Sequence, residues 1–298
     1  MELKRVVGST YYVRGSPSTL IHIQSGIAYV IDPGHSSKRA RRIGKELRSA
    51  GVREILVLIT HYHSDHYSSR SIGELGPARV LAPAREYSLI ASGKARTLLT
   101  YGYPTSKPEH FILHPVEEVQ GLEVLDVNML REVQTIQLPG HTEGHTGFST
   151  EDGVLYVGDA VFGDRVLSAY PIPFHTRPCD ALQSLKILER LAGRHDYFLM
   201  GHGGLVRRAD VIEVLDSNAK AIERGFVEVE RALSRGLGTP GEIAYHIIST
   251  SRESQEKDKA LVGLTEIIVR GYLACMYDDG LVEPFVSHGG LAWRLARG

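Results

Sequence analysis

Hydrophobic and polar positions alternate along the first thirty residues, and turn residues interrupt the alternation at short intervals. Such a pattern is typical of short antiparallel strands. After Asp32-Pro33-Gly34 the period changes: apolar residues recur at helical spacing from Ser37 to Ala50, and basic residues occupy the remaining faces. A continuous apolar run from Ile55 to Ile59 follows, as in a strand buried on both sides. This part of the chain therefore predicts an antiparallel meander, a helix with a solvated basic face, and a buried strand.

Strands and helices continue to alternate to about residue 205, which predicts mixed α/β architecture with sheets between helices. The segment from Ser92 to Gly121 is rich in Pro, Gly, Tyr and Lys and breaks this rhythm. We predict an insertion or a mobile loop there. The other elements expected in this part are helices over 84–91 and 180–191 and strands over 80–81, 133–138, 147–149, 154–157 and 197–200.

The C-terminal part has a different pattern. A long helical stretch runs from Arg207 to about Arg235, and Thr239-Pro240-Gly241-Glu242 forms a capping box at the start of a further helix. A second helix, from Leu264 to Asp279, precedes two short strands around a turn. Helix, helix and hairpin are the outline of a winged-helix module. We therefore expect a main domain over 1–206, a helical connection over 207–238 and a winged-helix-like module over 239–298.

The composition is that of an ordinary globular protein, with 42% hydrophobic and 23% charged residues among 298. No apolar run approaches the length of a membrane span, and the first residues lack the apolar core of a signal peptide. Cys179 and Cys275 are too few for a disulfide framework and form no C-x-x-C pair, which agrees with a reducing compartment. We expect a cytoplasmic protein. The net charge of -1 offers no global basic field for nucleic acid or membrane.

The chain contains 14 histidines, and several of them cluster with aspartates at the ends of predicted strands. The buried strand ends in the string H-x-H-x-D-H, formed by His61, His63, Asp65 and His66. In an extended segment alternate side chains share a side, so His61 and His63 can bind one metal while Asp65 and His66 face another. Imidazole and carboxylate together are the ligands of zinc or a similar divalent ion.

Three further loops follow predicted strands and offer matching ligands. They contain His141, Asp159 and His202, each with a neighbouring glycine that allows close backbone approach. The carboxyl ends of strands are where open α/β sheets place their sites. We therefore expect these three loops to join the H-x-H-x-D-H segment.

These residues, with Asp32 in Ile-Asp-Pro-Gly, resemble the five-motif set of the metallo-β-lactamase superfamily over roughly residues 5 to 205. The resemblance implies an αββα sandwich, in which two sheets lie back to back with helices outside. It implies a structural role for Asp32 and a supporting role for His145. It also implies two groups of metal ligands and one bridging carboxylate: His61, His63 and His141 for the first metal, Asp65, His66 and His202 for the second, and Asp159 as the bridge.

The function implied is metal-assisted hydrolysis, as in the glyoxalase II and lactonase branches of the superfamily. Two divalent cations about 3.5–4 Å apart acidify a shared water, and the bridging hydroxide attacks a small-molecule ester, thioester or lactone. Asp65 and Asp159 are the carboxylates expected to serve catalysis while holding the metals. Zinc is the metal expected from the ligand types, although iron and manganese accept the same residues.

Two other functions stay open. Some proteins of this fold with a winged helix are ribonucleases, and a third hypothesis is a DNA-binding protein with a vestigial or structural metal site. From Thr239 to Gly298, however, there are six basic and eight acidic residues. A module that neutralises phosphates should be basic, so we interpret it as a packing or pocket-closing element. The expected partner is a small-molecule substrate rather than a nucleic acid or membrane, and a homo-oligomer stays open.

The rim of the site is less defined by the sequence. Family lactonases often place a tyrosine a few residues after the bridging aspartate, where this chain has Ala160-Val161-Phe162. Other side chains in the loop after Asp159 and in the insertion are candidates for holding a polar or anionic substrate. They are Arg165, Tyr170, His175 and Arg177 in the loop, and Lys94, Arg96, Tyr101 and Tyr103 in the insertion.

Overall fold

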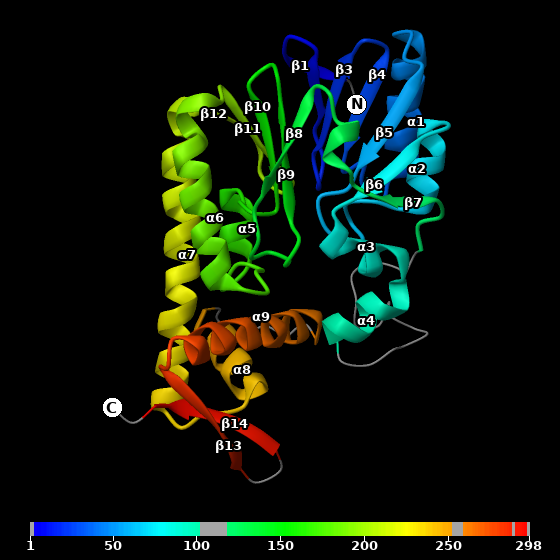
Figure 1. Ribbon diagram of the computed structural model, residues 1–298. Helices are drawn as coiled ribbons and strands as arrows, with labels where there is room; N and C mark the ends of the chain where they lie inside the picture. Colours follow the sequence, from blue (N-terminus) through cyan, green and yellow to red (C-terminus); the bar gives the residue numbers. More distant parts are fainter. Residues whose placement is uncertain (1–2, 102–117, 252–258, 288–289, 297–298) are drawn as a thin grey trace.

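Two β-sheets lie face to face, with helices covering both outer faces (Figure 1). The computed structural model describes residues 3–101, 118–251, 259–287 and 290–296. The arrangement confirms the predicted αββα sandwich, with a helical C-terminal region attached below it in this view.

The first sheet has the strand order β1 to β7. Its first four strands form the predicted antiparallel meander, and β4 to β7 pair in parallel. Parallel neighbours need crossover helices, which here cover the outer face of the sheet. The elements are β1 (Lys4–Val7), β2 (Thr10–Val13), β3 (Thr19–Gln24), β4 (Ile27–Ile31), α1 (Ser37–Ser49), β5 (Glu54–Leu58), α2 (Ser69–Leu75), β6 (Arg79–Ala82), α3 (Ala84–Ala91), α4 (Gly93–Tyr101) and β7 (Leu122–Val124).

The second sheet has the order β12-β11-β10-β9-β8. Only its β10 and β11 pair in parallel, and α6 and α7 cover its outer face (Figure 1). The elements are the 3-10 turn η2 (Val127–Met129), β8 (Val133–Gln137), β9 (Thr146–Thr150), β10 (Val154–Gly158), α5 (Asp164–Ala169), α6 (Pro178–Leu191), the 3-10 turn η3 (Ala192–Arg194), β11 (Tyr197–Met200), β12 (Gly204–Arg207) and α7 (Arg208–Ser234).

The core between the two sheets is apolar and closed to solvent. Tyr29 and Leu58 of the first sheet and Phe148 and Tyr156 of the second belong to one buried cluster, each with no exposed surface. Alternate residues of each strand face this layer, as the period of a strand requires. The sandwich therefore fixes the relative position of the strand ends from both sheets.

The segment after α3, for which the sequence predicts an insertion or a mobile loop, begins with a helix. Residues Gly93–Tyr101 form α4, so this part is not a loop. The Ser92 hydroxyl accepts a hydrogen bond from Ala95 N (3.2 Å), and the side chains of Arg96 and Thr97 are buried, so packing stabilises this helix. Residues 102–117 of this segment, including Tyr103, lie outside the described residues.

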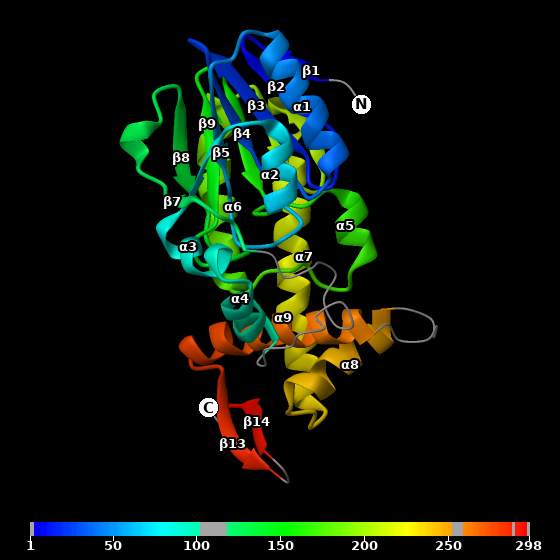
Figure 2. The same ribbon diagram turned by 90° about the vertical axis from the view of Figure 1, so that its right-hand side faces the viewer.

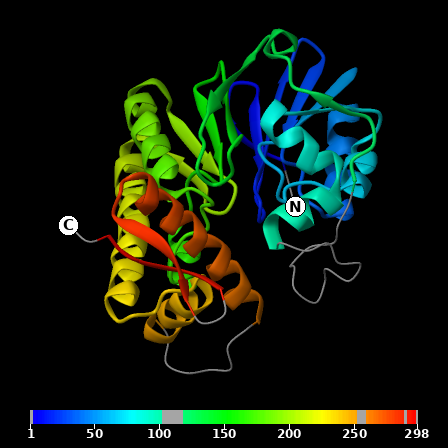
Figure 3. The same cartoon turned by 60° about the horizontal axis from the view of Figure 1, so that its bottom comes forward.

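The C-terminal helices and hairpin follow α7. Thr239 and Glu242 form the expected capping box, because Glu242 accepts from Thr239 N (2.9 Å) and Thr239 Oγ1 accepts from Glu242 N (3.2 Å). Figures 2 and 3 show α9 crossing beneath the sandwich towards α4. Within the described residues no helix is both long and apolar enough to cross a membrane. The elements are α8 (Pro240–Ser251), α9 (Lys259–Asp278), β13 (Val282–Ser287) and β14 (Gly290–Leu295).

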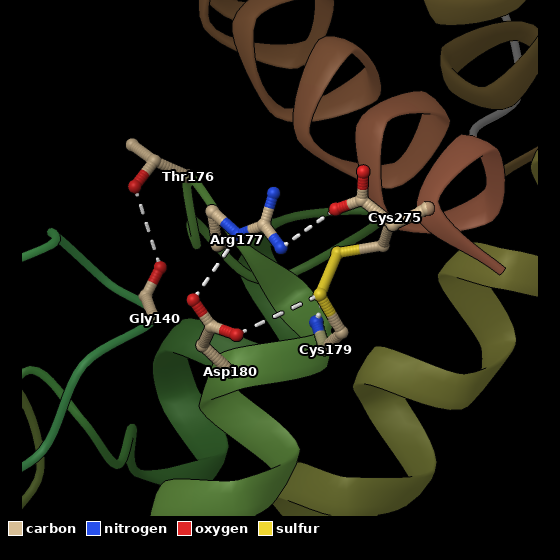
Figure 4. Close-up of a disulfide and its surroundings, with 7 residues drawn as sticks. Gly140, Thr176, Arg177, Cys179, Asp180 and Cys275 are labelled. Atoms are coloured by element: carbon tan, nitrogen blue, oxygen red, sulfur yellow. Dashed lines mark hydrogen bonds and ion pairs between the residues drawn. A yellow bond between two sulfur atoms is a disulfide. The ribbon is translucent and has the colours of Figure 1, made fainter.

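The two cysteines form a disulfide, although their number and spacing in the sequence agree with a reducing compartment. Cys179 at the start of α6 is bonded to Cys275 on α9 across 96 positions of sequence (Figure 4). Arg177 reinforces the same junction through ion pairs with Asp180 (3.1 Å) and Asp278 (3.0 Å). Disulfides are uncommon in most reducing compartments, so the cysteines no longer support the predicted cytoplasmic location.

Reducing this disulfide should destabilise the folded chain. A bridge that closes so long a loop restricts the unfolded state, so we expect the free energy of unfolding to fall by about 2–4 kcal/mol. Denaturant unfolding with and without dithiothreitol measures the effect. The double variant Cys179→Ala/Cys275→Ala is the control and should not respond to the reductant; equal stability of the oxidised and reduced wild-type chain would contradict the prediction.

Candidate metal centre

The predicted ligand residues meet at one edge of the sandwich, where strands of both sheets end. His61 follows β5, Asp159 follows β10 and His202 follows β11, while His141 lies in the loop between β8 and β9. Because the inter-sheet core fixes the strands, it also fixes where these loops begin. Side chains that are far apart in the sequence thus converge on one buried location.

Three imidazoles form the first group. His61 Nε2 lies 3.2 Å from His141 Nε2, and His63 Nδ1 lies 2.8 Å from the same atom. His61 is fully buried and His141 nearly so. All three nitrogens lie within 4.8 Å of one another, a spacing that lets one cation contact all of them.

The second group joins a carboxylate to two imidazoles. His202 Nε2 lies 3.0 Å from Asp65 Oδ2 and 3.3 Å from His66 Nε2. These three atoms also lie within 4.8 Å of one another. The two groups are therefore the same two sets that the sequence predicts.

Asp159 lies between the groups. Its Oδ2 is 3.6 Å from His141 Nε2 in the first group, and 3.3 Å from His66 Nε2 and 3.4 Å from His202 Nε2 in the second. Its Oδ1 is buried and has no hydrogen-bond partner in the part of the chain that the structure describes. The backbone of Gly201 passes so close that a Cβ there would lie 2.3 Å from Oδ1. A shared carboxylate with an unused oxygen is the donor that a pair of cations requires.

Hydrogen bonds on the far side of the His61 and His141 rings fix the inward lone pairs of both. His141 Nδ1 donates to Phe174 O (2.6 Å). Thr60 Oγ1 donates to Asp32 Oδ2 (2.7 Å) and can then accept from His61 Nδ1 (2.8 Å). Both rings therefore point unprotonated Nε2 atoms at each other. Two lone pairs at 3.2 Å repel unless a cation lies between them, so the donor set fits divalent metal.

Asp32 supports the centre without lying among the inward-facing donors. Its carboxylate accepts from Thr60 N (2.9 Å), Thr60 Oγ1 and Tyr156 OH (3.1 Å), and it lies 2.7 Å from His66 Nδ1. Its φ of 48° places the backbone in the left-handed region. These bonds orient His66 and tie the H-x-H-x-D-H loop to β4, in agreement with the structural role expected of Asp32.

His145 lies directly behind Asp159. Its Nε2 accepts a hydrogen bond from Asp159 N (3.1 Å), and burial lowers the pKa of His145 to about 3. The ring is therefore neutral, as this acceptor role requires. A Cβ on residue 158 would lie 2.6 Å from His145 Nε2, and the φ of Gly158 is +53°. Glycine is therefore required at this position.

Glu86 connects two ligand loops, and no local sequence pattern points to it. This buried carboxylate on α3 accepts from Tyr62 N (2.9 Å) with one oxygen, and from Thr142 Oγ1 (2.8 Å) and Gly144 N (2.6 Å) with the other. Burial raises the pKa of Glu86, and the three hydrogen bonds oppose that effect. Glu86 thus joins the H-x-H-x-D-H loop to the His141 loop.

A second support holds His202. Ser16 Oγ lies 2.6 Å from His202 Nδ1, and Ser18 N donates to Gly201 O (2.8 Å). Arg39 on α1 fixes this loop by donating to Pro17 O (2.6 Å) and Val13 O (3.3 Å). Burial lowers the pKa of Arg39 to about 10, which leaves it charged at neutral pH. The sequence suggested only that the basic side chains of this helix face solvent, which is wrong for Arg39.

The two groups differ in their electrostatics. Burial lowers the pKa of His61 and His63 well below the ordinary histidine value, and neighbouring imidazoles act in the same direction. Burial alone would also lower the pKa of His66 and His202, but the surrounding carboxylates raise it above the ordinary value. The first group is thus neutral at neutral pH, whereas the second attracts protons in the absence of metal.

A cavity of about 910 Å³ opens over the two groups. Of the predicted rim residues, Arg96, Arg165 and Tyr170 line it, whereas Lys94 does not. His175 is instead fully buried next to His141, with their ring centroids 5.9 Å apart. Arg177 forms its ion pairs at the α6–α9 junction and also lies outside the lining. The side chains of Tyr101 and Tyr103 are outside the described part of the chain.

Replacing Glu86 by glutamine should weaken the centre. The amide offers one acceptor oxygen where the carboxylate offers two, so one of the loop donors loses its partner. We expect the free energy of unfolding to fall by about 1–3 kcal/mol and metal affinity to fall about 10- to 100-fold. Chemical denaturation and chelator competition measure these effects.

Glu143→Gln is the matched control, because Glu143 is exposed and its ion pair with Arg85 (3.3 Å) lies at the surface. It should leave both quantities nearly unchanged. Wild-type metal affinity in Glu86→Gln would rule out the proposed connection between the loops.

Known proteins resemble this chain in sequence. A hydroxyacylglutathione hydrolase of Alkalilimnicola ehrlichii is 30% identical over 136 residues, covering 46% of this chain and 43% of that protein. Another, of Shewanella baltica, is 30% identical over 165 residues, covering 55% of this chain and 52% of that protein. The chain thus spans about half the length of the curated relatives it matches.

Solved structures share the fold over nearly the whole chain. A metallo-beta-lactamase family protein from Thermus thermophilus has a TM-score of 0.64 at 19% identity, covering 96% of this chain and 98% of its own. A beta-lactamase domain protein from Burkholderia ambifaria has a TM-score of 0.62 at 17% identity, covering 99% of this chain and 94% of its own. The sequence profile of the metallo-beta-lactamase superfamily matches residues 11–202. The chain therefore belongs to the metallo-β-lactamase superfamily.

Proposed function

We propose that this protein is a hydrolase of small-molecule thioesters and related esters that uses two divalent metal ions. The observation that carries the proposal is a pair of three-donor groups, 3.3–3.6 Å from one shared carboxylate oxygen of Asp159, below an open cavity. Structural metal sites are closed, whereas catalytic sites keep a position open to substrate. The names of the relatives support the reaction class, because hydroxyacylglutathione is chemically an acyl thioester.

In this proposal the two groups would each hold one metal ion, and Asp159, which lies between them, would serve both. Zinc would suit their nitrogen and oxygen donors. When bound, such ions lower the pKa of water to about 7 and polarise a carbonyl oxygen. The side-chain sets are His61, His63 and His141 for one ion and Asp65, His66 and His202 for the other.

The protein's own groups determine the geometry of the reaction. Burial alone would raise the pKa of Asp65 and Asp159, but the surrounding histidines hold the pKa of both carboxyls below the ordinary value, so both are ionised. Both can therefore bind a cation without first releasing a proton. Hydrolysis forms a bond between the water oxygen and the acyl carbon and breaks the carbon–sulfur bond, and the proton released by the water passes to the thiolate.

Removing one ligand should abolish both metal binding and activity. In Asp65→Ala and His61→Ala we expect loss of at least one metal equivalent and a fall in thioester hydrolysis of about 100-fold or more. Metal analysis of purified protein and a substrate panel of thioesters, lactones, phosphodiesters and single-stranded RNA measure this. The control is His246→Gln on α8, outside the cavity lining.

Wild-type turnover in the ligand variants or in chelator-treated protein would contradict the proposed mechanism. Cleavage of phosphodiesters alone would replace the thioesterase proposal by the nuclease alternative.

The two metal ions should dissociate one after the other as the pH falls, first from the second group and then from the first. The pKa values of His66 and His202 lie above the ordinary value, so a cation must displace protons from these rings already near neutrality. The pKa values of His61 and His63 lie well below it, so these rings stay neutral to lower pH. We expect the ion of the second group to dissociate first as the pH falls towards the ordinary histidine pKa of about 6.5, and the ion of the first group only at lower pH. Native mass spectrometry at decreasing pH measures the order; loss of the first group's ion before the second's would contradict it.

A further inference from the structure

Two chemically different kinds of side chain line the cavity above the candidate metal centre. Leu264 and Ile268 of α9 and Phe174 are apolar, and we call these three residues the apolar wall. Arg14, after β2, and Arg165, on α5, are cationic, and we call them the cationic wall. A cavity lined by both kinds of side chain selects ligands that have both characters.

The apolar wall lies beside the first ligand group. The ring centroid of Phe174 is 5.3 Å from that of His63 and 5.7 Å from that of His141. Ile268 is only 4% exposed, so it contributes to the hydrophobic core as well as to the cavity surface. An apolar chain placed here would be removed from water next to the reacting centre.

The cationic wall lies beside the second ligand group. Arg14 lies two positions before Ser16, whose hydroxyl is 2.6 Å from His202 Nδ1. Arg165 lies two positions after Gly163, whose N–H donates to His202 O (3.0 Å). Neither arginine has an ion-pair partner among the described residues, and the acidic side chains described in the lining are Asp65 and Asp159 themselves. These positive charges are therefore available to an anion.

The packing of α9 holds the apolar wall in place. A Cβ at Gly271 would lie 2.2 Å from Thr176 O, which shows how closely α9 contacts the loop that follows Phe174. The disulfide between Cys179 and Cys275 and the ion pair of Arg177 secure the same contact (Figure 4). The C-terminal helices thus supply a fixed part of the substrate cavity, rather than a separate attached module.

We propose that the substrate is an acyl thioester with an apolar acyl chain and an anionic group on the leaving thiol. This inference rests on the proposed hydrolase function. The acyl chain packs on Leu264, Ile268 and Phe174, and the anion of the thiol faces Arg14 and Arg165. Water adds its oxygen to the acyl carbon, the carbon–sulfur bond breaks, and the water's proton goes to the departing thiolate, which yields a fatty carboxylic acid and an anionic thiol.

A matched set of substrates tests both walls. Acetyl, butyryl and hexanoyl groups are each joined to mercaptopropionate and to its neutral amide, and kcat/KM is measured with the metal-loaded protein. We expect kcat/KM to rise about fourfold for each added methylene and the anionic thiol to be preferred about fivefold over the amide.

Variants separate the two contributions. Leu264→Ala should flatten the dependence on chain length and keep the preference for the anionic thiol. The double variant Arg14→Gln/Arg165→Gln should keep the dependence on chain length and lose the preference for the anionic thiol. The controls are Ile267→Ala, on the same helix but outside the lining, and Arg42→Gln, an exposed arginine on α1; both should retain the wild-type pattern.

Binding distinguishes failure of this inference from failure of the proposed function. Calorimetry with hexanoyl and acetyl thioether analogues, in which a CH₂ replaces the carbonyl, does not depend on hydrolysis. If the protein hydrolyses all members equally, or the variants leave the preferences unchanged, the proposed substrate class is wrong. If no member is hydrolysed but the hexanoyl analogue still binds tighter than the acetyl one, the cavity assignment stands and the hydrolase function fails.

Discussion

The architecture of the centre depends on holding several imidazole lone pairs closer together than they would lie by themselves. His61 and His141 present unprotonated nitrogens at 3.2 Å, and His66 and His202 face each other at 3.3 Å. Such an arrangement is electrostatically unfavourable without cations, so the fold must hold it in place. The surrounding hydrogen bonds do this: each of these four rings has a partner on its outer nitrogen, and the ligand loops are joined to one another.

The anchoring residues come from different layers of the sandwich. Asp32 at the end of β4 orients His66, Glu86 on α3 ties two loops together, and Arg39 on α1 fixes the loop that contacts His202. Each is buried, so each would be costly if its partners were removed. The stability of the outer helices and the geometry of the site are therefore coupled through a few polar side chains.

The sequence predicts the clustering residues well because most of their information is local. The H-x-H-x-D-H string follows an apolar strand directly, and His141, Asp159 and His202 each lie next to a strand end with a glycine alongside. Residues whose role depends on distant packing are different. Glu86 has the sequence surroundings of any helical acid, α4 depends on tertiary contacts, and Cys275 meets Cys179 only because α9 folds beneath the sandwich. Local patterns contain no record of such contacts, so the position of α9 in the cavity wall needed the structure.

The disulfide has a further consequence for how the chain is held together. It converts the 96-position segment between α6 and α9 into a closed covalent ring that contains α7 and α8. A protease that cuts one peptide bond inside this ring cannot release the C-terminal helices, because the two fragments stay joined through sulfur. The wall of the cavity is thus attached to the catalytic layers by two covalent paths, and losing it requires both a cut and a reduction.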